Sequence, residues 1–108
     1  MYKINLRIDR LRFESHYYLG LSLFNVGDMN SAIESFIKAK VLNPHHFETH
    51  FHLGISLFNK GDMKSAIEEF KICKSMSPIN ASVLYNLGIS FFNSGDKKSA
   101  MEEFIKAI

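Results

Sequence analysis

The pattern of apolar and polar positions repeats along the chain. Three Leu-Gly pairs, Leu19-Gly20, Leu53-Gly54 and Leu87-Gly88, recur at a period of about 34 residues. Other positions keep the same step: Phe24, Phe58 and Phe92; Asn25, Asn59 and Asn93; Gly27-Asp28, Gly61-Asp62 and Gly95-Asp96; Ala32, Ala66 and Ala100; Phe36, Phe70 and Phe104. We therefore divide the chain into two full units, 13–46 and 47–80, and an incomplete third unit, 81–108.

Each unit predicts two helices separated by the Gly-Asp pair. In the first unit Leu19, Leu23 and Phe24 recur at helical spacing, and Gly27 suits a left-handed C-terminal cap. Asp28 suits the N-cap of the second helix, because its carboxylate can accept a backbone N–H. The expected buried stripe of that helix is Ala32, Ile33, Phe36 and Ile37. Each unit is therefore predicted to be a helical hairpin.

Asn43-Pro44 and Ser77-Pro78 are expected to close the units, because the residue before a proline is displaced from helical dihedrals. A lone hairpin cannot bury its apolar faces, whereas stacked hairpins can. The three mid-helix glycines each cost roughly 1 kcal/mol relative to alanine. We expect close helix contact to explain them, with the repeated alanines Ala32, Ala66 and Ala100 opposite. On the outer face, Glu34–Lys38 and Glu102–Lys106 have favourable spacing for ion pairs.

These motifs together resemble the tetratricopeptide repeat. The resemblance implies an all-α, right-handed superhelix of helical hairpins, in which the first helices line a concave groove for peptides or helices of partner proteins. Bulky aromatic positions of the family hold His16, His50 and Leu84 here, and Cys73 replaces a small alanine. These exchanges affect packing more than fold.

The resemblance also assigns the groove residues by register. They are Tyr17, Leu21, Phe24 and Asn25; Phe51, Ile55, Phe58 and Asn59; Tyr85, Ile89, Phe92 and Asn93, with Glu14, Glu48 and Ser82 beside them. The groove would be aromatic and aliphatic, and the asparagines could bind a ligand's backbone. A family subclass grips a partner's C-terminal carboxylate with basic groove residues, but apolar side chains fill that region here. In the alternative interpretation, the phenylalanines pack between helices and the asparagines cap the first helices.

The two ends of the sequence differ from a full unit. Residues 2–9 align one period before residues 36–43, so residues 1–12 are expected to be the tail of a preceding repeat helix. The third unit stops before its closing turn, and we expect a fragment of a longer array. Alternatively, the ends associate between molecules and form a homo-oligomer.

No catalytic constellation is apparent in the sequence. His45, His46, His50 and His52 are dense, but no cysteine or carboxylate completes a zinc site, so we expect packing roles and no metal or cofactor. Cys73 is expected to be a buried, inert thiol. We interpret the chain as a non-catalytic scaffold; an accessory segment of a larger enzyme is another possibility.

Composition and charge limit which partners and which cellular location we expect for the chain. The net charge is only +2, from 13 Lys+Arg against 11 Asp+Glu, and does not indicate a nucleic-acid surface. Polar residues interrupt every apolar run, which argues against membrane insertion. The first residues lack a secretory signal pattern, so a cytoplasmic location is expected. The predicted function is protein–protein interaction through an apolar groove, with self-association as the alternative.

Overall fold

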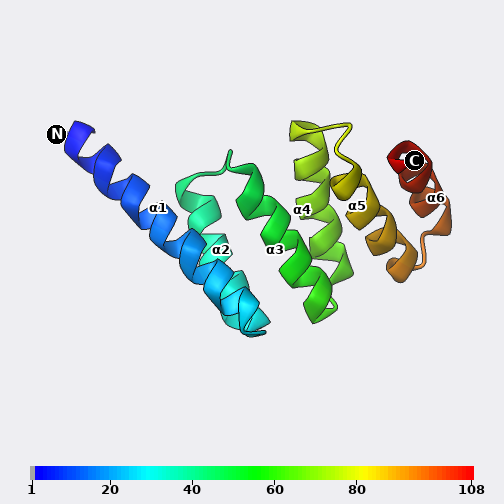
Figure 1. Cartoon of the computed structure of the whole chain (residues 1–108), viewed down its shortest axis with the longest axis horizontal. Coiled ribbons are helices and arrows are strands. Elements are labelled where there is room, and N and C mark those ends of the chain that lie inside the picture. Colours follow the sequence, from blue (N-terminus) through cyan, green and yellow to red (C-terminus); the bar gives the residue numbers. More distant parts are fainter. Residues whose placement is uncertain (1) are drawn as a thin grey trace.

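The computed structural model describes residues 2–108, with side chains from Arg7 onwards. Six α-helices follow one another: α1 (Tyr2–Asn25), α2 (Met29–Leu42), α3 (Phe47–Lys60), α4 (Met63–Met76), α5 (Ala81–Ser94) and α6 (Lys97–Ala107). They form a row of hairpins, α1 with α2, α3 with α4 and α5 with α6, in an elongated body of 51 × 27 × 18 Å (Figure 1). The predicted all-α hairpin solenoid is confirmed, and the described part of the chain contains no strand.

The Gly-Asp pairs act as the sequence predicts. Gly61 and Gly95 adopt left-handed φ angles of 95° and 94°, where a side chain would be strained. The carboxylates of Asp28, Asp62 and Asp96 then accept the backbone N–H three residues later, which caps the second helix of each hairpin. The hairpin turn is therefore determined locally by two residues.

The turns between hairpins use different caps. His46 caps α3 through Nδ1, which accepts the N–H of Thr49 at 3.2 Å. Asn80 caps α5 through its side-chain oxygen, which accepts the N–H groups of Ser82 and Val83. The prolines Pro44 and Pro78 lie in these turns, after α2 and α4 have ended.

The mid-helix glycines face phenylalanines. A Cβ placed on Gly20, Gly54 or Gly88 would lie 2.6 Å from Cε1 of Phe36, Phe70 or Phe104, respectively. We expected the repeated alanines Ala32, Ala66 and Ala100 to lie opposite the glycines, and this was wrong. The alanines are buried, but the phenylalanine four residues after each alanine is the side chain that covers the glycine. The missing Cβ makes room for an aromatic ring.

The N-terminal helix is longer than the repeat predicts. α1 runs without a break from Tyr2 to Asn25, so residues 2–12 continue the first helix of the first hairpin. They do not form a separate preceding helix with a closing turn. The physical reason is local: Arg10 stands where Pro44 closes the next unit, and no glycine or proline interrupts residues 2–12.

Ion pairs connect neighbouring hairpins. Lys40 of α2 lies 2.7 Å from Glu69 of α4, and Lys74 of α4 lies 3.0 Å from Glu103 of α6. The bond to Glu103 raises the pKa of Lys74. The i,i+4 pairs expected on the outer face, Glu34–Lys38 and Glu102–Lys106, are not formed among these described residues. The two lysine–glutamate pairs therefore form between adjacent hairpins, whereas Arg12 and Asp9 pair within α1.

Candidate protein-binding groove

The predicted groove residues all lie on the first helices α1, α3 and α5, and the exposure of the aromatic members differs between the hairpins. Tyr17 is only 8% exposed and belongs to the core, whereas Tyr85 and Phe92 are 55% and 56% exposed. The remaining apolar members are half-buried: Leu21, Phe24, Phe51, Ile55, Phe58 and Ile89. The third hairpin therefore presents the most accessible aromatic surface of this set.

Half-burial has a consequence for Phe24 and Phe58. Both rings pack against the hydrophobic core while part of each remains at the surface. Replacing either one would disturb the fold as well as any contact with a partner. Packing and ligand contact are not exclusive for these residues.

The three asparagines Asn25, Asn59 and Asn93 are exposed at the ends of the first helices. The helix ends are completed by backbone bonds instead, such as those from the N–H groups of Gly61 and Asp62 to the carbonyls of Phe58 and Leu57. Within the described chain, no helix-capping bond from an asparagine side chain is formed at these positions. The amides of Asn25 and Asn93 are therefore available to a ligand.

His52 lies at the centre of an aromatic cluster that sequence reasoning missed. Its ring packs against the rings of Tyr17, Phe24, Phe36 and Phe51, with centroid separations of 5.9 to 6.1 Å. The Tyr17 hydroxyl lies 3.5 Å from its Nδ1, and burial raises the pKa of Tyr17. The equivalent residues of the three units differ, as Tyr18, His52 and Asn86. The repeat pattern therefore could not predict that His52 has this role.

A second histidine, His50, lies in a buried polar contact. Its Nδ1 lies 2.7 Å from Glu69, and its Nε2 donates to the carbonyl of Pro44 at 2.7 Å. Glu69 also binds Lys40, so one carboxylate joins α2, α3 and α4. We expected a space-filling role for His50; the ring also satisfies two polar groups at 3% exposure.

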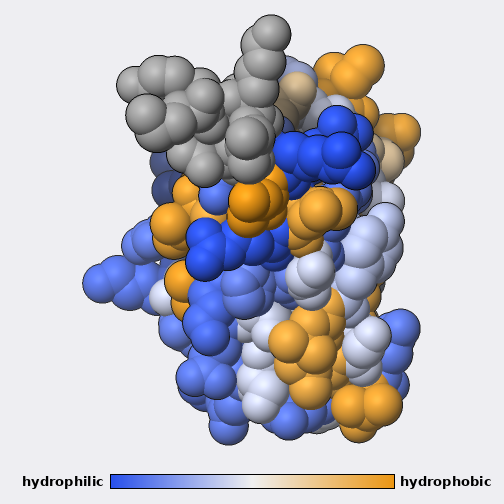
Figure 2. All heavy atoms as spheres, turned by 90° about the vertical axis from the view of Figure 1, so that its left-hand side faces the viewer, coloured by the Kyte–Doolittle hydropathy of each residue, from blue (hydrophilic) through white to orange (hydrophobic). Residues whose placement is uncertain are grey.

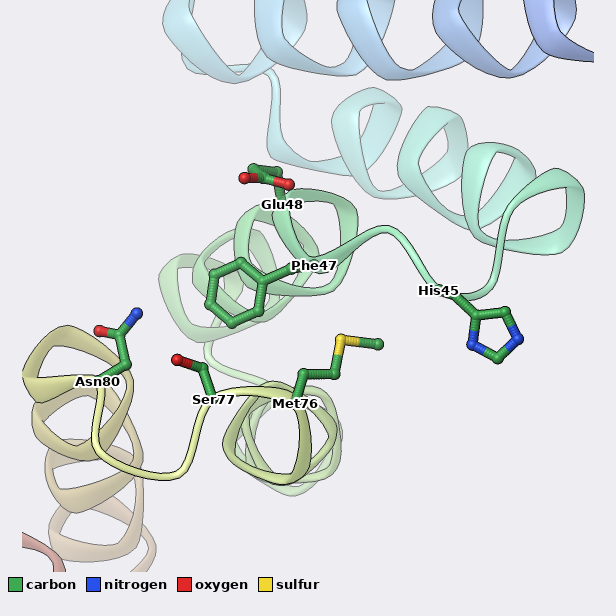
Figure 3. Close-up of a pocket in the computed structure, with 6 residues that line it drawn as sticks. All are labelled: His45, Phe47, Glu48, Met76, Ser77 and Asn80. Carbon is green, nitrogen blue, oxygen red and sulfur yellow. The ribbon is translucent and has the colours of Figure 1, made fainter.

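An open hollow of about 560 Å³ lies at the edge of the array, where α3 begins and α4 ends. Figure 3 shows Phe47, Met76 and Ser77 around it, with His45, Glu48 and Asn80 at its margins. A smaller hollow one repeat earlier uses the equivalent residues Phe13, Leu42 and Asn43. The two hollows lie at equivalent positions of successive hairpins, so they arise from the way the hairpins stack. The residues that line them do not form a catalytic group.

The surroundings of the remaining reactive side chains indicate structural roles. Cys73 is fully buried, and desolvation raises the pKa of its thiol to about 12. Within the described residues, no three His, Cys, Asp or Glu side chains come together in a group able to hold a metal ion. No helix there is both long and apolar enough to cross a membrane.

Stacked hairpins with glycine–phenylalanine contacts and aspartate caps define a class of helical repeat protein. The tetratricopeptide repeat profile matches residues 13–46, 47–80 and 81–108, and the chain belongs to the tetratricopeptide repeat family. Repeats of this family are generally non-catalytic, and family and fold support a general role as a protein-interaction scaffold.

Solved structures of MamA are similar to this chain. MamA AMB-1 is 30% identical with a TM-score of 0.85, and the match covers 88% of this chain and 52% of MamA. MamA MSR-1 is 29% identical with a TM-score of 0.84, over 88% of this chain and 55% of that protein. The chain thus spans about half the length of these relatives. No curated protein matches the sequence.

Proposed function

We propose that the chain binds a partner peptide or helix along α1, α3 and α5, through an apolar groove. The observation that carries this proposal is the exposure of Tyr85 and Phe92 on the same helix as the free Asn93 amide. Exposed aromatic rings lose water on binding, and an amide can both donate to and accept from a partner's backbone. The scaffold acts in the cytoplasm and contributes no catalytic step.

The chemistry of the groove favours an apolar partner. The half-buried Leu21 and Phe51 occupy the region in which related carboxylate-binding proteins place basic side chains, and Tyr17 there is buried in the core. A partner segment with aromatic or aliphatic residues matches this surface better than an acidic tail. Three hairpins offer a short groove, so we expect modest affinity from these residues alone.

Selection of binding peptides from a random display library tests the proposal. Affinities of selected peptides are then measured by fluorescence anisotropy against Phe92→Ala combined with Asn93→Ala. Both side chains are exposed, so circular dichroism should show an unchanged helix content. We expect at least a tenfold loss of affinity.

The matched control for this experiment is Val41→Ala, which removes an exposed apolar side chain from α2, outside the predicted groove. Its affinity should equal that of the unmodified chain. Equal loss in the control and the groove variant, or no loss in either, would contradict the groove assignment.

Self-association is a second candidate function, favoured by one specific observation. α1 and α6 expose large apolar side chains, including Leu11, Leu19, Met101 and Ile105. Exposed apolar patches of this kind mark interaction surfaces. A molecular mass that rises with concentration in light scattering would support this function, and a constant mass of 12.4 kDa would exclude it.

A further inference from the structure

The predicted groove carries negative charge and neither lysine nor arginine. Glu14 and Glu48 are the only charged side chains among the groove residues and those beside them. α5 contains no charged residue, and the lysines lie on the second helices α2, α4 and α6, apart from Lys3 in α1 and Lys60 at the end of α3. The arginines precede the first groove residue of α1: Arg7, Arg10 and Arg12. The charge of the groove is therefore opposite in sign to the net charge of the chain, +2.

Glu48 places one of these carboxylates at the surface of α3, near α1. It lies in the first turn of α3, its side chain is 58% exposed, and in Figure 3 it points away from the hollow at the edge of the array. Burial raises the pKa of Tyr17 on α1, and the negative charge of Glu48 raises it further, as a nearby carboxylate would. Glu48 contacts Nε2 of His46 at 3.4 Å. This distance exceeds the about 2.7–2.9 Å of a charge-assisted hydrogen bond, so the carboxylate can still bind a cation.

His52 and Asn86 each present a hydrogen-bond acceptor on the same helices. Nδ1 of His52 lies 2.8 Å from the carbonyl oxygen of Glu48, and because a carbonyl only accepts, Nδ1 carries the proton of the neutral ring. Nδ2 of Asn86 donates to the carbonyl of Ser82 at 2.7 Å. In the described chain, Nε2 of His52 and Oδ1 of Asn86 make no hydrogen bond, and no buried polar side-chain atom lacks a partner. Both acceptors are therefore open to solvent.

Aromatic rings lie beside both acceptors. The His52 ring packs against Phe24 and Phe51 of the predicted groove, and Asn86 follows the exposed ring of Tyr85. The face of an aromatic ring attracts an ammonium or guanidinium group, and its edge packs against apolar side chains. The surface seen from the α1 end is likewise mixed, with hydrophobic residues set between hydrophilic ones (Figure 2). An occupant with both apolar and polar side chains fits such a surface.

We propose that the partner segment carries a lysine or arginine among its apolar residues, and that this cation binds Glu48 and His52 between α1 and α3. The proposal rests on the proposed groove function and specifies the charge of the partner. An arginine has enough N–H donors to bind the carboxylate and Nε2 of His52 together. Its apolar neighbours cover the rings of Phe51 and Tyr85. An acidic segment or a nucleic acid would instead bring negative charge towards Glu48.

The peptides selected from the random display library test this proposal. Their sequences should contain lysine or arginine more often than the unselected library. Synthetic peptides of these sequences should bind Glu48→Gln about fivefold more weakly than the unmodified chain in fluorescence anisotropy, and the difference should shrink in high salt. Glu48→Lys should reverse the preference: it should bind a peptide whose basic residue is replaced by glutamate more tightly than the unmodified chain does.

Glu34→Gln is the matched control, because it removes an exposed carboxylate from α2, outside the predicted groove. It should bind the peptides like the unmodified chain, and circular dichroism should show the same helix content in both variants. His52→Asn, which copies the third hairpin, should retain most of the affinity, whereas His52→Leu should lose it because the acceptor is gone.

The outcomes separate this proposal from the groove function itself. Selected peptides without basic residues, or peptides that bind Glu48→Gln as tightly as the unmodified chain, would overturn the basic partner. The groove would still stand if Phe92→Ala with Asn93→Ala weakened their binding. Equal losses in Glu48→Gln and Glu34→Gln would also overturn the proposal, because they would reflect the overall charge of the chain. A library that yields no binding peptide would overturn both the groove and its partner.

Discussion

The contact between a glycine and a phenylalanine recurs in each hairpin and explains an unfavourable helix residue. Gly54 has no Cβ, and the Phe70 ring occupies the space where one would lie. The period in the sequence predicted close contact at Gly54, but it could not identify which residue makes it. Ala66 and Phe70 are both periodic, and only the direction of the side chains distinguishes them.

Gly54→Ala should destabilise the protein although alanine favours helices. The added Cβ would have to displace a fully buried ring, and overpacking of this kind costs about 1–3 kcal/mol. The free energy of unfolding in urea measures the effect. In a double-mutant cycle with Phe70→Leu, the second substitution should reduce the penalty of Gly54→Ala. Additive losses would show that the ring is not the obstacle.

Asp96 gives α6 a stability that depends on pH. The Ser99 hydroxyl and backbone N–H both donate to its carboxylate, and these bonds lower its pKa. Because the pKa is lowered in the folded state, the Asp96 carboxylate contributes fully to the free energy of unfolding above the usual pKa of aspartate. This contribution is lost as the pH falls through the lowered pKa.

An NMR titration of the Asp96 carboxyl carbon tests this prediction. The midpoint should lie below the ordinary value for aspartate and should move up towards it in Ser99→Ala, which removes the hydroxyl donor. An unchanged midpoint in that variant would show that the hydroxyl does not stabilise the charge.

The helices and their ends were largely predictable because local signals define them. Gly-Asp pairs and prolines marked the boundaries of α2 to α5 within the chain. The boundary predicted after residue 12 came from the repeat period alone. Residues 2–12 contain no glycine or proline to end a helix, so α1 continues through this boundary. For the groove, the register named the helices, but the exposure of each side chain depends on neighbouring elements, as Tyr17 and Tyr85 show.

The contact of Glu69 with α2 and α3 should make it more important than its equivalent on α6. Glu69 binds both Lys40 and His50. Glu103 binds Lys74, but its own hairpin has Leu84 at the position equivalent to His50. Glu69→Ala should cost about 1–3 kcal/mol more than Glu103→Ala, because it leaves a buried ring nitrogen without a partner.

Chemical denaturation of both variants measures this difference. Adding His50→Leu to Glu69→Ala removes the unpaired ring nitrogen and places a leucine where the third hairpin has Leu84, so it should recover part of the loss. Equal losses for Glu69→Ala and Glu103→Ala would show that the histidine contact contributes nothing.

At the scale of the whole molecule, each hairpin packs only on its neighbours, so stability should vary along the array. α4 lies between α3 and α5, and Phe70 is completely buried; α6 packs on α5, and Phe104 remains half-buried. Amide hydrogens of α6 should therefore exchange faster than those of α4. Amide exchange followed by NMR in the unmodified chain checks this. Faster exchange in α4 would contradict it.

The bond from His50 to the carbonyl of Pro44 makes the two joints of the array mechanically unequal. Hydrogen bonds are directional, and each joint has a lysine–glutamate bond, Lys40–Glu69 or Lys74–Glu103. The first joint also has the bond from His50 to the carbonyl of Pro44, which adds resistance to rotation about the stacking direction. The next joint has Leu84 in place of the histidine, and apolar packing has no preferred direction. Under a bending load, the array would act as a stiff pair of hairpins with a more compliant third.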